Sequence, residues 1–199
     1  MQPTETPLET NGKSTQDDEE LTKELIDTAE SMAIETDKGN FTRSRFGSYP
    51  RRKGVILVTN DRYKGVIPTG HSAIVYSSKH VIEALDSGVT KVKNTWDKSK
   101  SQVYAVTVRT TSAAQGARAA NWSYNRIGKP YNWNFYRMDY RGSFYCSQLI
   151  RSAFLDLYGI DLNTGDYGIL GARAIHSMKL ISTSKTSLVY RKKQVVFEK

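Results

Sequence analysis

The chain has 199 residues and a formal net charge of +9, and it contains one cysteine. This length accommodates one well-packed domain with an appendage rather than two full domains. A single cysteine excludes an intramolecular disulfide and zinc sites made of several cysteines. The sequence also contains no run of about 18 apolar residues that would span a bilayer. We therefore expect one catalytic or binding domain without a transmembrane segment.

The charge is divided unevenly along the chain. Residues 1–40 contain eleven acidic residues and three lysines, a net charge of −8, which leaves +17 for the rest of the chain. A domain with so large a positive charge is attracted to polyanions, which include nucleic acid, anionic lipid and the anionic polymers of a bacterial cell wall. Charge alone does not choose among these partners.

The N-terminal part predicts two segments outside the main domain. Residues 1–16 are polar and contain several threonines and prolines, a composition typical of a disordered tail that follows a cleaved secretion signal. Residues 17–35 combine apolar residues at helical spacing with acidic residues in the first turn, which predicts an acidic amphipathic helix within the segment 17–40. We expect this helix to pack on the basic domain or to bind a partner. The domain itself is expected to cover residues 41–199 of an extracellular or cell-wall-associated protein.

Short apolar or β-branched segments, separated by turn residues, fill the first half of the domain. They predict strands at residues 54–59, 71–77, 79–85, 89–96 and 102–110, with a closing strand or two within residues 187–199. Together these segments predict the β part of an α+β fold, as a small antiparallel sheet or barrel.

Two helices and an aromatic loop follow the predicted strands. The alanine-rich residues 112–128 predict a helix that ends at a glycine, and residues 129–145 form a loop unusually rich in aromatic side chains. The strongest helical pattern covers residues 146–159, where apolar side chains recur every three or four positions and Gly159 provides the C-cap. A further short helix is expected near residues 172–178.

Cys146 lies in the first turn of the most strongly patterned helix, on its apolar face. The positive end of the helix dipole lowers the pKa of a thiol and stabilises the thiolate, which is the nucleophilic form. Backbone N–H groups at the same helix end have no intrahelical acceptor and can stabilise an oxyanion. A lone cysteine is commonly a buried apolar residue, but this position predicts a catalytic nucleophile.

A catalytic thiolate needs a base, and the chain has three histidines, His71, His80 and His176. His71 follows Gly70 at the start of an apolar strand, where a polar side chain has a structural cost unless it is used. His80 lies beside a polar turn, and His176 lies in a polar stretch with no obvious group to orient it. We therefore predict His71 as the general base and a surface or core role for the other two.

The imidazole also needs a third polar group to orient it. Nine acidic residues lie beyond residue 40, and Glu83 is the one inside an apolar strand segment. If residues 71–77 and 79–85 pair through the short turn between them, His71 and Glu83 meet on one face of the sheet. The alternative is that Glu83 lies on a solvated strand face.

Two segments resemble the two halves of the NlpC-type cell-wall peptidases. GKPYNWNFYRMDYRGSFYCSQLIRSAFLDLYGIDL, residues 128–162, resembles the nucleophile half, in which a Gly-x-Pro-Tyr turn and an aromatic loop precede a Cys-Ser-x-Leu helix. KGVILVTNDRYKGVIPTGHSAIVYSSKHVIEAL, residues 53–85, resembles the half that carries the histidine and the third polar residue. The histidine half comes first here, so the chain is similar to circularly permuted papain-like cysteine hydrolases of the YiiX and YycO-like branch. One departure is Val55, because these families usually carry an aspartate after the glycine at this point.

The resemblance implies a permuted papain-like fold, in which a small antiparallel sheet packs against the helix that bears the nucleophile. It implies catalysis by Cys146, His71 and Glu83, with Tyr131 beside the nucleophile and without a cofactor or a metal ion. Aromatic side chains of this region either line a groove for a peptide or glycopeptide substrate or belong to the core, and they are Tyr131, Trp133, Phe135 and Tyr145.

These features predict a thiol hydrolase that cleaves amide bonds in cell-wall peptides through a thioester intermediate. Two alternatives stay open: the same site could act on lipid esters or amides, or the domain could be a non-catalytic basic module that binds anionic polymers. An apolar patch around the site would favour lipid, and an open polar groove would favour peptide. No specific nucleic-acid contact is expected, because the aromatic residues cluster beside the cysteine and do not alternate with lysine and arginine along a strand.

Overall fold

The computed structural model describes residues 45–60, 70–163 and 175–193. The tail predicted at residues 1–16 and the helix predicted at residues 17–35 lie outside these ranges. The described strands are β1 (Arg45–Phe46), β2 (Ile56–Thr59), β3 (His71–Val75), β4 (His80–Leu85), β5 (Gly88–Lys93), β6 (Val103–Val108) and β7 (Thr186–Lys192). The described helices are α2 (Trp96–Ser99), α3 (Ala113–Tyr124), α4 (Cys146–Tyr158) and α5 (Lys179–Ser182).

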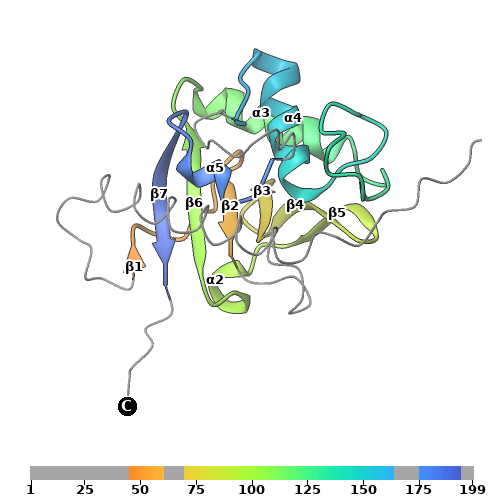
Figure 1. The fold of residues 1–199 in the computed structure, drawn as a ribbon. Coiled ribbons are helices and arrows are strands. Elements are labelled where there is room, and N and C mark those ends of the chain that lie inside the picture. The colour runs from red at the N-terminus through yellow and green to blue at the C-terminus, as the bar shows by residue number, and fades with distance from the viewer. Residues whose placement is uncertain (1–44, 61–69, 164–174, 194–199) are drawn as a thin grey trace, which may run out of the picture.

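The seven described strands form one sheet with the order β1-β7-β6-β2-β3-β4-β5, and every neighbouring pair is antiparallel. Figure 1 shows α3 and α4 together on one side of this sheet, with α2 away from them at the opposite end. An antiparallel sheet with its main helices on one face is an α+β arrangement. The predicted fold class is therefore confirmed.

Apolar side chains of the central strands point alternately to the two faces of the sheet, as the period of two requires. On the face that carries α3 and α4, strand residues such as Ile56 and Ile74 pack with Leu149 of α4 in the main core. On the other face, Leu57 and Val75 belong to a second cluster. Burial of each such side chain stabilises the fold by about 1.5–3 kcal/mol.

Helix α4 begins at Cys146 and ends where Gly159 adopts a left-handed conformation with φ 67°. The backbone N–H of Gly159 donates to the carbonyl of Leu155 and closes the last turn. Leu149 and Phe154 are almost fully buried on the face toward the sheet. This apolar face holds the first turn of α4 against the sheet.

Two predicted helices differ from the structure. The helix predicted over residues 112–128 ends at Tyr124, because the following chain pairs with β5: the Gly128 N–H donates to the Val89 carbonyl and the Val89 N–H donates to the Lys129 carbonyl. The helix expected near residues 172–178 lies partly outside the described ranges, and its described end is not helical.

The described end of that second segment forms a turn that is held by hydrogen bonds to the helix bearing the nucleophile. The Ile175 N–H donates to the Tyr145 hydroxyl, and the Ile175 carbonyl accepts a hydrogen bond from the Ser147 hydroxyl. The short helix α5 begins only at Lys179. Residues 175–178 are thereby placed beside the first turn of α4.

The strands follow the predicted segments with shorter ends. The segment predicted as a strand over residues 89–96 leaves the sheet after Lys93, and Trp96 opens the short helix α2. Strand β1 was not predicted, since its two residues lie in a segment rich in glycine, serine and arginine.

Candidate active site

Cys146 is the first residue of α4 and is almost fully buried, with 7% of its surface exposed. The residue before it, Tyr145, is extended, and its backbone N–H donates to the side chain of Gln148 at a distance of 3.1 Å. The thiol therefore occupies the first turn of a helix whose start is fixed by a side-chain cap. This is the position that the sequence predicted for the nucleophile.

His71 is the first residue of β3, directly after Gly70. Gly70 has a φ of 63°, and a Cβ added to it would lie 2.6 Å from the carbonyl oxygen of Thr59. Only glycine makes this tight entry into the strand without strain. The His71 ring is covered by the indole of Trp96, with ring centroids 5.5 Å apart. The imidazole is thus held in place by both the backbone and a buried aromatic side chain.

Glu83 lies on β4 and is 6% exposed. In the antiparallel register Ala73 pairs with Glu83, so His71, two residues before Ala73, is the diagonal neighbour of Glu83 on the same face. The Glu83 Oε2 atom lies 2.7 Å from the His71 Nε2 atom. Because Nε2 faces the carboxylate, Nδ1 is the ring nitrogen that remains for Cys146. The structure therefore brings the three residues predicted for catalysis into one group.

The ionisation of this group follows from its contacts. Burial disfavours the charged thiolate, but the charge of His71 and its hydrogen bond outweigh that cost and lower the pKa of Cys146 to about 6. Burial also disfavours the imidazolium, but hydrogen bonds and charge from Cys146 and then Glu83 raise the pKa of His71 to about 9. The pair therefore exists as thiolate and imidazolium at neutral pH.

The structure adds Ser177 to this group, a residue that the sequence analysis did not select. The Ser177 Oγ atom lies 3.4 Å from the Cys146 Sγ atom, and Ser177 is 1% exposed. This hydroxyl and the backbone N–H of Ser72 both lower the pKa of the Cys146 thiol. No periodic pattern could reveal Ser177, because the segment from Ile175 to Met178 was predicted as a helix and is held instead by contacts with α4.

Replacing Ser177 by alanine is expected to raise the thiol pKa of Cys146 by about one unit, because the thiolate loses one hydrogen bond from a hydroxyl. The measurement is the rate of thiol alkylation as a function of pH. Ser147→Ala is the matched control, since the Ser147 hydroxyl donates to the Ile175 carbonyl and not to the sulfur. An unchanged pKa in Ser177→Ala, or an equal rise in Ser147→Ala, would contradict a direct contact with the thiolate.

The other two histidines are not connected to the thiol by any hydrogen bond among the described residues. His80 Nδ1 lies 3.3 Å from the Ser77 hydroxyl, in the turn between β3 and β4. His176 Nδ1 accepts from the Met178 N–H at 3.3 Å, and burial together with the charge of Lys179 lowers the pKa of His176 to about 4. An imidazole that stays neutral in this way is poorly suited to pair with a thiolate.

The aromatic residues predicted to line a groove differ in how deeply they are buried. Tyr145 is only 3% exposed, and its hydroxyl donates to the Phe135 carbonyl and accepts from the Ile175 N–H. Tyr145 therefore joins two segments and offers little surface to a substrate. Tyr131 is half-buried, and its ring lies 4.6 Å from the ring of Trp133, which is 61% exposed. Substrate contact by Tyr131 and Trp133 stays a prediction.

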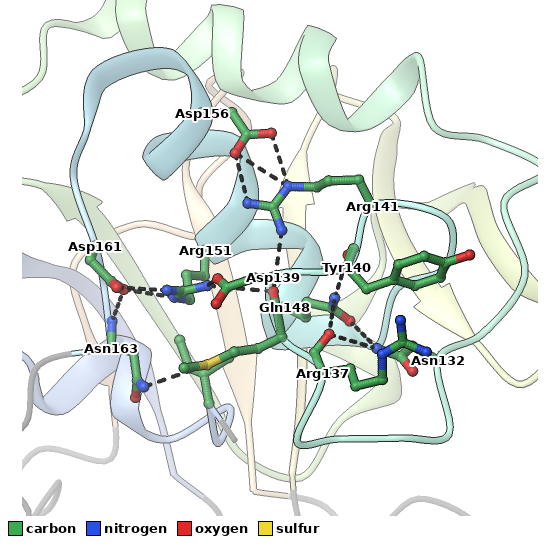
Figure 2. A network of polar contacts seen from close by, with 12 residues as sticks. Asn132, Arg137, Asp139, Tyr140, Arg141, Gln148, Arg151, Asp156, Asp161 and Asn163 are labelled. Carbon is green, nitrogen blue, oxygen red and sulfur yellow. Dashed lines mark hydrogen bonds and ion pairs between the residues drawn. The ribbon is translucent and has the colours of Figure 1, made fainter. Parts of the chain in front are cut away.

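Residues 131–144, named the aromatic loop here, have their two ends joined by a bridge between Tyr131 and Phe144. The loop closes around the side chain of Gln148, as Figure 2 shows. The Gln148 Nε2 atom donates to the carbonyls of Arg137 and Tyr140, and its Oε1 atom accepts from the Asn132 amide. A fully buried glutamine on the nucleophile helix thus sets the position of the loop.

Arg151, one turn further along α4, fixes the outer side of the same loop (Figure 2). Its guanidinium pairs with Asp139 at 2.8 Å and with Asp161 at 2.7 Å. Burial lowers the pKa of Arg151, but the two carboxylates outweigh this effect and raise it above its usual range. Gln148 and Arg151 connect the aromatic loop to the helix that carries the nucleophile.

Residues 45–60, 70–163 and 175–193 contain no group of three or more His, Cys, Asp or Glu side chains arranged to hold a metal ion. No helix in that part of the chain has the length and apolar character needed to cross a bilayer. That the protein needs no cofactor stays a prediction.

Comparison with known families decides the class of this site. The model for the permuted papain-like amidase enzymes, the YaeF/YiiX C92 family, matches residues 54–195. The chain belongs to this family. Membership confirms the predicted permuted papain-like fold and the predicted class of cysteine hydrolase. The family is one of amidases, which agrees with a buried thiol whose pKa is lowered by the imidazole at the start of β3.

Two known proteins are similar to the chain. The uncharacterized protein YycO of Bacillus subtilis (strain 168) is 30% identical over 143 residues, which are 69% of this chain and 55% of YycO. The chain therefore spans about half the length of the curated relative that it matches. The crystal structure of the metalloprotein YiiX from Escherichia coli O157:H7 matches with a TM-score of 0.56 at 17% identity, over 73% of this chain and 99% of that chain. At this identity the likeness shows the fold.

Proposed function

We propose that the protein is a cysteine amidase that hydrolyses amide bonds in the peptide part of the bacterial cell wall. Cys146 is the nucleophile, His71 is the general base and acid, and Glu83 orients the imidazole. The observation that carries this proposal is the position of His71, whose Nε2 atom lies 2.7 Å from the Glu83 Oε2 atom and whose charge lowers the pKa of the buried Cys146 thiol. A structural histidine would need neither partner.

The reaction begins with attack of the Cys146 thiolate on the carbonyl carbon of the amide, which forms the C–S bond and a tetrahedral oxyanion. The proton on His71 Nδ1 then passes to the leaving nitrogen as the C–N bond breaks, and the amine departs. The neutral imidazole next takes a proton from water, whose oxygen attacks the thioester. Collapse of the second tetrahedral intermediate breaks the C–S bond, releases the carboxylic acid and restores the thiolate and the imidazolium.

Backbone N–H groups of the first turn of α4 are placed to stabilise both oxyanions. The first residues of a helix have no intrahelical acceptor for their N–H groups, and the helix dipole adds partial positive charge there. Cys146 is the first residue of α4, so the thiol and these donors belong to one element. Stabilisation of an oxyanion by such donors contributes about 10²–10³-fold to the rate.

The substrate is proposed from chemistry and charge together. The family is one of amidases, which specifies the bond. The chain beyond residue 40 has a net charge of +17, which favours binding in an anionic envelope. We therefore place the enzyme outside the cell or at the cell wall, acting on a peptide or glycopeptide substrate.

Incubation of the full chain with purified cell-wall peptides tests the proposal, with new amino groups and new carboxyl groups counted separately. We expect equal numbers of both, because hydrolysis of one amide bond gives one of each. The rate is expected to fall below pH about 6, where the thiolate is protonated, and above pH about 9, where the imidazolium loses its proton. Cys146→Ser is the control and should be inactive, since a hydroxyl at this site is not ionised. Hydrolysis of lipid amides or esters in place of wall peptides would refute the proposed substrate.

A further inference from the structure

The aromatic loop exposes an unusual set of side chains. Tyr136, Trp133 and Tyr140 are 69%, 61% and 46% exposed, and they are the three most exposed of the large apolar side chains in the described ranges. Single exposed aromatic residues are common on protein surfaces, but three in one short loop form a patch that is typical of a binding site.

The backbone of the loop is held by several hydrogen bonds and one ion pair. Gln148 bonds to the Arg137 and Tyr140 carbonyls, the Asn134 N–H donates to the Asn132 side chain, and Arg151 holds Asp139. Because these contacts are made without any ligand, little conformational entropy is lost when a ligand binds. The aromatic loop is therefore preorganised for binding.

The outer surface of the loop is hollowed. A depression of about 410 Å³ is lined by Tyr136, Arg137, Met138, Asp139 and Tyr140. The Arg137 guanidinium lies 4.7 Å from the centroid of the Tyr140 ring. Asp139 is oriented by Arg151, and 76% of its side chain is exposed. The depression thus combines aromatic surface with an exposed cation and a carboxylate that is paired with Arg151.

We propose that this depression binds a sugar ring of the cell-wall glycan, as a site separate from the one that holds the scissile amide. A sugar ring has one face of C–H groups, which packs on an aromatic ring, and a rim of hydroxyl and amide groups. Tyr136 and Tyr140 provide the aromatic surface, while Arg137 and Asp139 provide a donor and an acceptor for the rim.

A membrane surface fits the same loop less well. A loop that enters a bilayer interface carries a continuous apolar face, with cations at its margin. Here the polar side chains of Arg137 and Asp139 stand between Tyr136 and Tyr140, and the surface is concave. These features suit a ring of defined shape and not a flat lipid layer.

The depression is connected to the active site through aromatic contacts. Phe135 of the loop packs edge to face on Tyr145, with ring centroids 5.3 Å apart, and Tyr145 directly precedes Cys146. The loop that carries the depression is therefore packed against the residue that precedes the nucleophile. The inference rests on the proposed function for the identity of the glycan, while the sugar site itself does not depend on hydrolysis.

Binding is measured by calorimetric titration of the full-length Cys146→Ser protein with chitotetraose, an oligomer of N-acetylglucosamine that carries no peptide. We expect saturable binding that Tyr136→Ala and Tyr140→Ala each weaken about tenfold, whereas Tyr136→Phe retains it because the ring is kept. Tyr124→Ala is the matched control, since Tyr124 is also exposed but lies on α3, outside the aromatic loop. Binding that is absent, or that both alanine variants leave unchanged, would overturn the inference. Binding to phosphatidylglycerol vesicles that the same two variants abolish would also overturn it, in favour of a membrane contact.

A second measurement separates this inference from the proposed function. In the active protein, Tyr136→Ala is expected to slow hydrolysis of intact cell wall but not of a wall peptide without sugar. If neither substrate is hydrolysed while chitotetraose still binds through Tyr136, the proposed function fails and the sugar site stands. If wall and free peptide are both hydrolysed at unchanged rates by Tyr136→Ala, the sugar site fails and the proposed function stands.

Discussion

Replacing His71 by glutamine is expected to lower the rate of amide hydrolysis by about 10³-fold or more, because general acid and base catalysis is lost and the thiolate loses its counter-ion. Glutamine suits this experiment because its side-chain amide can still donate to Glu83, which is 6% exposed and would otherwise be left buried without a partner. Steady-state hydrolysis of the wall peptide gives the change in rate.

His80→Gln is the matched control for His71→Gln. The two histidines open neighbouring strands, but the His80 ring lies near the Ser77 hydroxyl and not near the thiol. The control is expected to keep wild-type activity. Equal losses in the two variants would mean that the effect is structural, and an active His71→Gln protein would exclude His71 as the base.

Replacing Gln148 by alanine is expected to have the largest effect on stability, lowering the free energy of unfolding by about 3–5 kcal/mol. Gln148 is fully buried, and its side chain bonds to four groups, which are the Asn132 amide, the Arg137 and Tyr140 carbonyls and the Tyr145 N–H. Alanine leaves these groups without that partner. The aromatic loop then loses its buried attachment to α4, while the ion pair of Arg151 with Asp139 remains. Urea denaturation measures the change.

Gln115→Ala separates the buried network from helix capping alone. Gln115 occupies the same position of α3 as Gln148 does of α4, and its side chain accepts from the Ser112 N–H, but it is only half-buried and holds no loop. We expect this variant to cost about 1 kcal/mol or less. Comparable losses of unfolding free energy in Gln115→Ala and Gln148→Ala would show that the contacts of Gln148 with the aromatic loop add no stability beyond that of a helix cap.

The predicted positions that the structure reproduces are those set by local periodicity, while the catalytic roles of these residues stay predictions. Cys146 was located from the apolar spacing of one helix, and Glu83 from its place inside an apolar strand. The antiparallel register of β3 and β4 then brings Glu83 to His71 by the geometry of a short hairpin. Local patterns were therefore sufficient to predict that Cys146, His71 and Glu83 lie near one another.

The parts that the sequence did not predict depend on contacts between segments far apart in the chain. Ser177 contacts Cys146 because residues 175–178 bond to α4 instead of forming a helix. Trp96 covers His71 although it was assigned to a strand that in fact ends at Lys93. Tertiary hydrogen bonds and packing decide such positions, and they leave no pattern in the local sequence.

The alkylation rate of Cys146 by iodoacetamide, followed from acidic to basic pH, tests the central claim most directly. A thiolate stabilised by His71 predicts that the rate rises with an apparent pKa of about 6. The same measurement on His71→Gln should give a much higher pKa. A wild-type thiol that titrates near its ordinary pKa of about 8.5, unaffected by this substitution, would contradict the pairing of Cys146 with His71.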